Sequence, residues 1–159
     1  MLIALENAAS TLAANADWGI RIKETAKEEK ASVQQLLKYA DREKESLKSS
    51  IPGAIYKTYM DETHPLGFGT NGLYFSLKQD RVLYEPSNSA WNVGSFKKDS
   101  YITGFAGVKA KAALEEGVLF GVKQFGAGKI IYMADDPIFR NFWEGGKLIL
   151  TNAVFLHGK

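Results

Sequence analysis

The sequence of 159 residues contains no cysteine and only two histidines, His64 and His157. The missing cysteine excludes disulfides, a thiolate nucleophile and any zinc or iron–sulfur site held by thiolates. A catalytic zinc site usually needs three protein ligands, and neither histidine stands in an H-E-x-x-H pattern. Asp61, Glu62 and His64 form a conceivable small metal site, but acidic residues beside a His-Pro turn are commonly capping groups. The sequence therefore predicts no metal and no cofactor in this chain.

The sequence also lacks a strong charge excess and a long hydrophobic run. It has 20 Lys and Arg against 18 Asp and Glu, a net charge of +2, which does not indicate a nucleic-acid partner or an anionic membrane surface. No apolar run approaches the roughly 18–20 residues of a membrane span, and no signal peptide can be read after Met1. We therefore expect no nucleic-acid partner and no membrane span. The hydrophobic content of 45% favours one packed domain.

The pattern of apolar residues predicts an α/β fold. Residues 2–5 are wholly apolar, as in a strand buried on both faces of a parallel sheet, and residues 7–15 favour a helix. Further strands are expected at residues 54–60, 73–77, 82–84, 118–125 and 129–134, and a closing helix at residues 144–157. Gly126-Ala127-Gly128 indicates an antiparallel hairpin near the end of the chain. Because the chain opens in mid-sheet, we expect it to be the C-terminal part of a larger domain.

Residues 21–48 differ in composition from the rest of the chain, since they carry eight basic and six acidic residues. Val33, Leu36, Leu37 and Ala40 follow the spacing of a helix with a thin apolar stripe, and Pro52 ends any helix before it. We expect a charged excursion or insertion from the core, either a solvated helix or a mobile segment. A helix that docks on a partner is the less favoured alternative.

Two glycine-rich stretches could be mistaken for phosphate-binding loops. Residues 67–72 match G-x-G-x-x-G, but the match precedes an expected strand, whereas a dinucleotide fingerprint follows a strand and opens a helix. Residues 126–129 lack the full spacing of a Walker loop. Both are interpreted as turns. No G-x-S-x-G motif occurs, so the sequence nominates no serine nucleophile.

The strongest local pattern lies at residues 135–143, where two carboxylates at the end of a strand meet an arginine and three aromatic residues. Asp135 and Asp136 could act as an acid and base pair, and Arg140 could hold an anionic group. The structural alternative is at least as good: the carboxylates cap a turn, Arg140 satisfies one of them, and Phe142 and Trp143 pack against the last helix.

Several stretches together resemble the C-terminal region of large bacterial zinc carboxypeptidases of the carboxypeptidase A superfamily. The stretches are residues 2–8, 51–55, 61–69 (Asp-Glu-Thr-His-Pro-Leu-Gly-Phe-Gly), 74–78, 91–94, 104–107 and 135–143 (Asp-Asp-Pro-Ile-Phe-Arg-Asn-Phe-Trp). The region resembled is a class I glutamine-amidotransferase-like domain that follows the peptidase domain. The resemblance covers most of the chain outside residues 16–49 and implies a flavodoxin-like three-layer sandwich.

The resemblance implies that residues 1–159 form a single amidotransferase-like domain fragment. Glutamine hydrolysis in such domains needs a cysteine at a nucleophile elbow, and this chain has none. We therefore expect no activity of this segment's own and no catalytic residue in it. The parent polypeptide is expected to be a zinc metallocarboxypeptidase whose zinc lies in the upstream peptidase domain. By the same resemblance, the parent is periplasmic or extracellular.

The leading hypothesis is a non-catalytic accessory domain that packs on the upstream peptidase domain as a scaffold or helps to orient peptide substrate. Its interface anchors would be Trp91, Phe142 and Trp143. The alternative is a small-ligand or carbohydrate-binding domain, because turns after separate strands can converge at one edge of a sheet. The ligand-binding residues in that case would be Glu6, His64, Asp135, Asp136 and Arg140. A vestigial hydrolase site on the same groups is a weaker third possibility.

Overall fold

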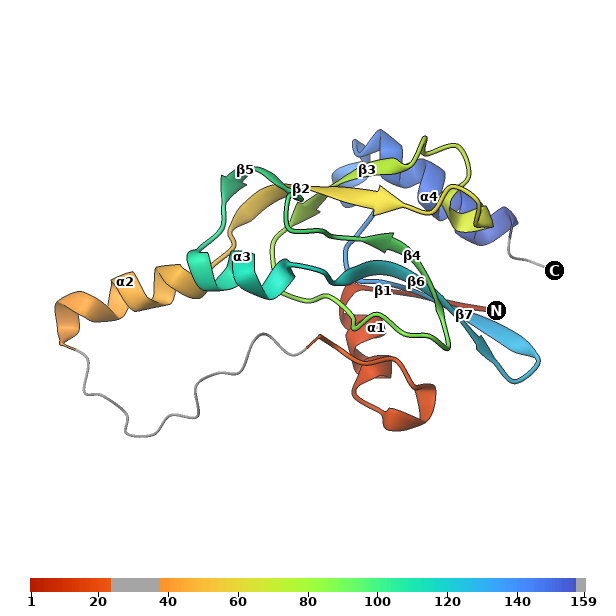
Figure 1. Ribbon diagram of the computed structural model, residues 1–159, viewed down its shortest axis with the longest axis horizontal. Helices are drawn as coiled ribbons and strands as arrows, with labels where there is room; N and C mark the ends of the chain where they lie inside the picture. The colour runs from red at the N-terminus through yellow and green to blue at the C-terminus, as the bar shows by residue number, and fades with distance from the viewer. Residues whose placement is uncertain (24–37, 157–159) are drawn as a thin grey trace.

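The computed structural model of the chain describes residues 1–23 and 38–156 (Figure 1). The predicted combination of α-helices with a β-sheet is confirmed, since these residues form one seven-stranded sheet and four α-helices. The strands are β1 (Leu2–Leu5), β2 (Gly53–Met60), β3 (Leu73–Lys78), β4 (Trp91–Ser95), β5 (Tyr101–Phe105), β6 (Val118–Phe125) and β7 (Gly128–Met133). The α-helices are α1 (Glu6–Ala13), α2 (Tyr39–Ser49), α3 (Val108–Leu114) and α4 (Glu144–Phe155).

The seven strands form one sheet in the order β1-β7-β6-β4-β2-β3, and β5 pairs with β2. Within the described residues, β1 and β7 are the one parallel pair, and every other pair is antiparallel. The predicted hairpin is confirmed by β6 and β7, whose register runs to the Phe125–Gly128 pair. The apolar first strand is parallel to its neighbour as expected, but it lies at an edge of the sheet, and Leu2 is exposed.

Some elements differ from the sequence expectation. Residues 82–84 form no strand; Tyr84 makes only isolated bridges to Ile22 and Val118. Strands β4 and β5 and helix α3 were not predicted. The sequences of β4 and β5 each contain a glycine, and bulges interrupt the pairing of β4 with β6 and of β5 with β2. Irregular pairing of this kind leaves no clean alternation to recognise.

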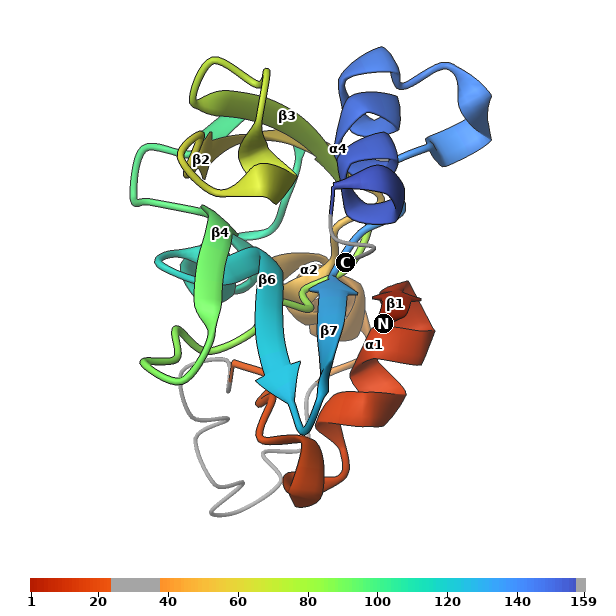
Figure 2. The ribbon, with the colours of Figure 1, turned by 90° about the vertical axis from the view of Figure 1, so that its right-hand side faces the viewer.

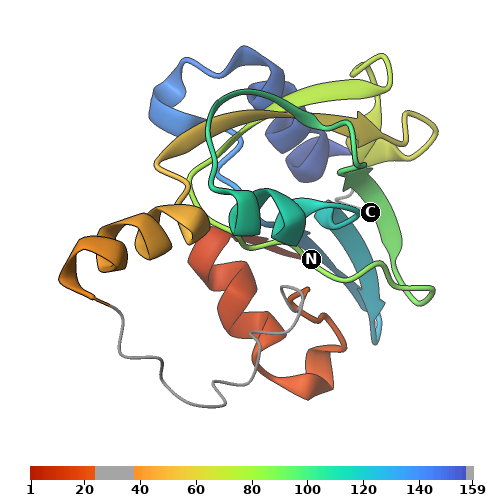
Figure 3. The ribbon, with the colours of Figure 1, turned by 60° about the vertical axis from the view of Figure 1, so that its left-hand side comes forward.

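Helix α2 accounts for part of the charged excursion predicted at residues 21–48. It ends at Ser49, before Pro52 as expected, whereas Val33, Leu36 and Leu37 lie outside the described residues. The helix packs against α3 away from the main body of the sheet (Figure 3). Glu45 accepts hydrogen bonds from Lys109 of α3 at 2.5 Å and from Lys48 at 2.6 Å. These bonds lower the pKa of Glu45 to about 2.

The sheet is strongly curved, because β3 reaches back towards the end of β7 although three strands separate them in the sheet order. Asp135 follows β7, yet its carboxylate contacts Ser76 and Lys78 of β3. Figure 2 shows β2 and β3 above β6 and β7, with α4 beside β3. The core inside this curve is built mainly from the central strands, and its largest buried aliphatic and aromatic side chains include Leu119, Phe120, Ile131 and Met133.

Helix α4 fastens the loop after β7 to the rest of the molecule. The Asn152 side chain donates hydrogen bonds to the carbonyl oxygens of Leu66 at 3.2 Å and Phe68 at 2.8 Å. At the other end of the helix, Gly146 lies directly against the carbonyl of Pro137, so that a Cβ atom there would lie 1.5 Å from that oxygen. The absence of a side chain at Gly146 therefore sets how closely α4 approaches residues 135–143.

We expect Gly146→Ala to lower the free energy of unfolding by at least about 1–3 kcal/mol, because the added methyl group must push a backbone carbonyl away. The neighbouring Gly145→Ala is the matched control. A Cβ at Gly145 meets the Tyr74 ring at an ordinary 3.5 Å, and alanine is the better helix former by about 0.5–1 kcal/mol. Urea unfolding of both variants checks the prediction. Equal effects of the two substitutions would contradict it.

Candidate functional site

A buried lysine forms the centre of the polar cluster at the end of β7. Lys78 is fully buried, and its ammonium group contacts Asp135 Oδ1 at 2.5 Å, Asp80 Oδ1 at 2.8 Å and the Val82 carbonyl oxygen at 2.9 Å. A lysine has three N–H donors, so these three acceptors satisfy it completely. Burial alone would lower the pKa of Lys78, but the charges of Asp135 and Asp80 outweigh burial and raise the pKa above its usual value. Lys78 is therefore a charged group inside the protein.

The partner carboxylate is equally enclosed. Asp135 is buried, and its second oxygen accepts a hydrogen bond from the hydroxyl of Ser76, which is also buried. Strand β3 thus supplies two neighbouring inward side chains to one carboxylate that follows β7. Each oxygen of Asp135 thus accepts a hydrogen bond from a side chain of β3, as in a structural ion pair.

Glu6 and Asp136 stand at the surface of the same cluster. Glu6 joins the parallel strand β1 to helix α1 with a positive φ of 45°, a conformation that costs a non-glycine residue of the order of 1 kcal/mol. Partial burial, followed by the charges of Asp136, Asp135 and Asp80, raises the pKa of Glu6. The structure therefore brings three of the five predicted ligand-binding residues together: Glu6, Asp135 and Asp136.

The other two predicted ligand-binding residues lie in different surroundings. Arg140 is exposed, has a φ of 49° and places its guanidinium 5.3 Å from the ring centroid of Phe139. His64 follows β2, where its Nδ1 accepts a hydrogen bond from the Leu66 amide at 3.2 Å and its ring lies 5.8 Å from that of Trp91. The pKa of the neighbouring Asp61 is lowered, mainly by a hydrogen bond from the Thr63 side chain. The sequence interpretation of this turn as a capping structure fits these contacts.

The predicted interface aromatics differ in exposure. Trp91 and Phe142 are exposed, whereas Trp143 is half-buried and donates a hydrogen bond from Nε1 to the Phe75 carbonyl oxygen at 2.7 Å. Phe75 belongs to β3, which is an edge strand of the sheet. A groove along this edge is lined by Thr70, Leu73, Tyr74, Phe75, Phe142, Trp143, Glu144 and Gly145, and we call it the β3 groove.

Sequence reasoning missed Ser76 and Lys78 for a specific reason. Strand β3 reads Leu-Tyr-Phe-Ser-Leu-Lys, which by ordinary alternation would bury Leu73, Phe75 and Leu77 and expose the polar residues. The structure has the opposite orientation: Ser76 and Lys78 are buried, whereas Leu73 is 43% and Phe75 47% exposed. The sequence did offer one signal. Asp135 is an acidic residue that directly follows an apolar strand, and a carboxylate buried at such a place needs a cation as its partner.

No family model, no curated protein and no solved structure matches this chain. Across residues 1–23 and 38–156, no three His, Cys, Asp or Glu side chains are grouped so that they could hold a metal ion. None of the helices in that part of the chain combines the length and the apolarity that crossing a membrane requires.

The Lys78–Asp135 pair can be tested by removing one charge. We expect Lys78→Met to lower the free energy of unfolding by about 3–5 kcal/mol, because Asp135 would remain buried without its partner. Adding Asp135→Asn should restore part of this loss. Lys147→Met, which breaks the exposed pair with Glu144 at 2.6 Å, is the control and should cost no more than about 1 kcal/mol. Denaturant unfolding gives all three values; a Lys78→Met variant as stable as the control would refute the assignment.

The raised pKa of Glu6 gives a second test. In Asp136→Asn the pKa of Glu6 should fall towards its ordinary value, because Asp136 makes the largest charge contribution after burial. Since a raised pKa means that the folded state holds the proton more tightly, this group adds stability below its ordinary pKa and loses it as the pH rises through the folded value. Carboxyl-carbon NMR titration measures the change. Asp41→Asn on α2 is the control and should leave the Glu6 titration unchanged.

Proposed function

We propose that this chain is a non-catalytic accessory domain that packs on a protein partner, the peptidase domain of a zinc carboxypeptidase. The observation that carries the proposal is the inverted orientation of β3. Its polar residues Ser76 and Lys78 are buried and donate hydrogen bonds to Asp135, whereas its apolar residues Leu73 and Phe75 are exposed. Exposed apolar side chains on an edge strand are costly for a protein that works alone, and they are typical of an interaction surface.

The surroundings of Leu73 and Phe75 support a docking surface. Phe142, 57% exposed, and the half-buried Trp143 line the β3 groove together with them. The indole of Trp143 is already fixed by its hydrogen bond to the Phe75 carbonyl, so the groove has one rigid aromatic wall. Aromatic side chains held in place before binding lose little conformational entropy when a partner covers them.

A second exposed apolar surface lies nearby on α4. Leu148 and Phe155 are seven residues apart and therefore on one face of the helix, and Phe155 is 76% exposed. The Gly69 position lies against Leu148, which brings the exposed Phe68 close to this face. A partner that covers β3 and α4 together would bury large side chains from three chain segments.

The polar cluster supports the non-catalytic part of the proposal. Lys78 has no N–H left for a substrate, and both oxygens of Asp135 are occupied by protein donors. The chain also has no cysteine to serve as the nucleophile of an amidotransferase. The finer fold assignment, a flavodoxin-like domain of which this chain is the C-terminal part, follows from the resemblance and is supported only by strand β1, which leads into α1 and pairs in parallel with β7. Zinc in the upstream domain, peptide substrate and a periplasmic or extracellular location follow from the resemblance alone.

The alternative function, a small-ligand or carbohydrate site at the strand ends, has less geometric support. Of its five residues, Asp135 is buried in an ion pair, and Arg140 and His64 contact Phe139 and Trp91 respectively. Glu6 and Asp136 remain as two carboxylates near each other, and their like charges disfavour an anionic ligand.

The test begins with the reading frame that precedes Met1. The proposal requires that this frame encode a peptidase domain with a zinc-binding H-x-x-E motif, and a frame without one would overturn it. With that polypeptide in hand, hydrogen exchange of the amides in β3 and α4 should be slower than in the isolated chain, because the partner covers them.

Point variants then locate the interface. We expect Phe75→Ser or Phe142→Ser to weaken the contact between the two domains, seen as lost exchange protection in both, and to leave the unfolding of the isolated chain nearly unchanged, since both side chains are exposed. Tyr59→Ser on β2 lies outside the β3 groove and serves as the control. Protection that is insensitive to all three substitutions would show that the partner binds elsewhere.

A further inference from the structure

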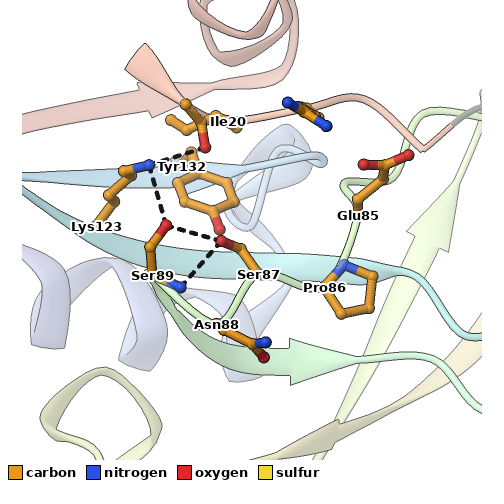
Figure 4. Close-up of a pocket in the computed structure, with 10 residues that line it drawn as sticks. Ile20, Glu85, Pro86, Ser87, Asn88, Ser89, Lys123 and Tyr132 are labelled. Atoms are coloured by element: carbon orange, nitrogen blue, oxygen red, sulfur yellow. Dashed lines mark hydrogen bonds between the residues drawn. The ribbon is translucent and has the colours of Figure 1, made fainter. Parts of the chain in front are cut away.

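A second, polar pocket lies apart from the groove and the strand-end cluster (Figure 4). Its volume is about 360 Å³, within the usual range for small-molecule sites. It is formed where the segment after α1 meets the loop before β4 and the hairpin strands β6 and β7. The lining residues are Gly19, Ile20, Arg21, Glu85, Pro86, Ser87, Asn88, Ser89, Lys123 and Tyr132.

Lys123 provides a fixed positive charge in this pocket. Its ammonium group donates to the Gly19 carbonyl oxygen at 2.9 Å and to the Ser89 hydroxyl at 3.3 Å (Figure 4). Two of its three N–H donors are thereby used, and the third is available to a ligand. Unlike Lys78, Lys123 has no carboxylate partner in the described parts of the chain.

The two serines are held in position by their own loop. The hydroxyls of Ser87 and Ser89 lie 3.0 Å apart, and the Ser89 amide donates to the Ser87 hydroxyl at 3.2 Å. Asn92 of β4 braces this loop twice, since its side chain accepts from the Ser87 amide and donates to the Ser87 carbonyl, both at 3.1 Å. The hydroxyl pair is therefore organised before any ligand arrives.

Tyr132 adds a hydroxyl group to the wall of the pocket. The residue is 1% exposed and lines the pocket, and among the described residues no hydrogen bond reaches its hydroxyl (Figure 4). The ring lies across Gly121 of β6, where a Cβ atom would come within 2.2 Å of the hydroxyl oxygen. Burial raises the pKa of Tyr132 to about 12, so that the hydroxyl is a neutral donor at ordinary pH. The hydroxyl is not one of the fully enclosed polar atoms without a partner, which among the described residues are those of Tyr56, Thr58 and Tyr84, so it is accessible from the pocket that Tyr132 lines.

Two further charged residues of the pocket, Glu85 and Arg21, limit which ligands can bind there. Glu85 and Arg21 also line the pocket and are joined through their backbones by the Glu85 amide and the Arg21 carbonyl at 2.9 Å, but no ion pair links their side chains within the described residues. A doubly charged phosphate would be disfavoured beside Glu85. A ligand with one negative charge and a donor group some distance away meets no such conflict.

From these contacts we infer that the pocket binds a small carboxylic acid that also carries an amino or hydroxyl group. Its carboxylate accepts hydrogen bonds from Lys123, from the serine hydroxyls and from Tyr132, and its donor group faces Glu85. This site belongs to different residues from the proposed partner surface and does not depend on that proposal.

Titration of the nitrogen-15-labelled chain with glycine and with glycolate tests the inference. We expect both to shift the amide resonances of residues 85–89, Lys123 and Tyr132, whereas glycinamide, which lacks the carboxylate, should not. In Lys123→Met the Kd for glycine should rise about tenfold or more, because a hydrogen bond from a charged donor is lost. Lys129→Met on the neighbouring strand is the matched control and should bind as the unchanged chain does.

Tyr132→Phe and Ser87→Ala provide a second test if Lys123→Met fails to fold, since each removes a single hydroxyl group; the loss in Ser87→Ala includes the bonds that this hydroxyl makes with Ser89. Each should weaken glycine binding several-fold and leave the spectrum of the free protein otherwise unchanged. Absence of any shift up to high millimolar glycine and glycolate would overturn the inference. Shifts caused by inorganic phosphate but by neither acid, or equal binding of glycinamide, would also overturn it.

Discussion

The buried pair of Lys78 and Asp135 constrains the whole fold. A buried ammonium group must find acceptors, and Asp135, Asp80 and the Val82 carbonyl are the three that the structure provides. Asp135 follows β7, whereas Lys78 is the last residue of β3. The two side chains can meet only because the sheet is curved, so that β3 lies close to the end of β7. The close approach of α4 at Gly146 then holds the loop that begins at Asp135. The Lys78–Asp135 contact and the close approach of α4 therefore both fix residues that follow β7 against the rest of the molecule.

The same pair selects the orientation of β3. A shift of one residue would turn every side chain of this strand to the other face, burying Leu73, Phe75 and Leu77 and gaining apolar burial. That shift would also leave Asp135 buried without Lys78 and Ser76, at a cost of several kcal/mol. The charge therefore decides against the apolar pattern. The result is an edge strand whose outer face is apolar, and it arises from the requirements of the interior.

In β3 the burial of a charged pair outweighs the apolar alternation, and such cases cannot be predicted from the sequence pattern alone. Strands with a single dominant pattern, such as residues 54–60 and the hairpin around Gly126, were located correctly because periodicity and turn residues agree there. Strands β4 and β5 were missed, since glycines and bulges break their alternation. Of the predicted ligand-binding group, Glu6 and Asp136 come together with Asp135 because all three follow the parallel strands β1 and β7. His64 could not be placed from sequence, because its position depends on how the antiparallel β2 is staggered against the rest of the sheet.

Strand β7 contributes a residue to the polar pocket and leads directly into the buried ion pair that anchors β3. Tyr132, which faces the polar pocket, stands three residues before Asp135, which anchors β3. A ligand that hydrogen-bonds Tyr132 would bind only when β7 is fully formed, and the same strand must be formed for Asp135 to reach Lys78. A ligand in the proposed pocket would therefore stabilise the folded chain as a whole, as any ligand that binds only the folded state does. Because the pocket and the β3 groove share no residue, a partner on β3 would leave the pocket open.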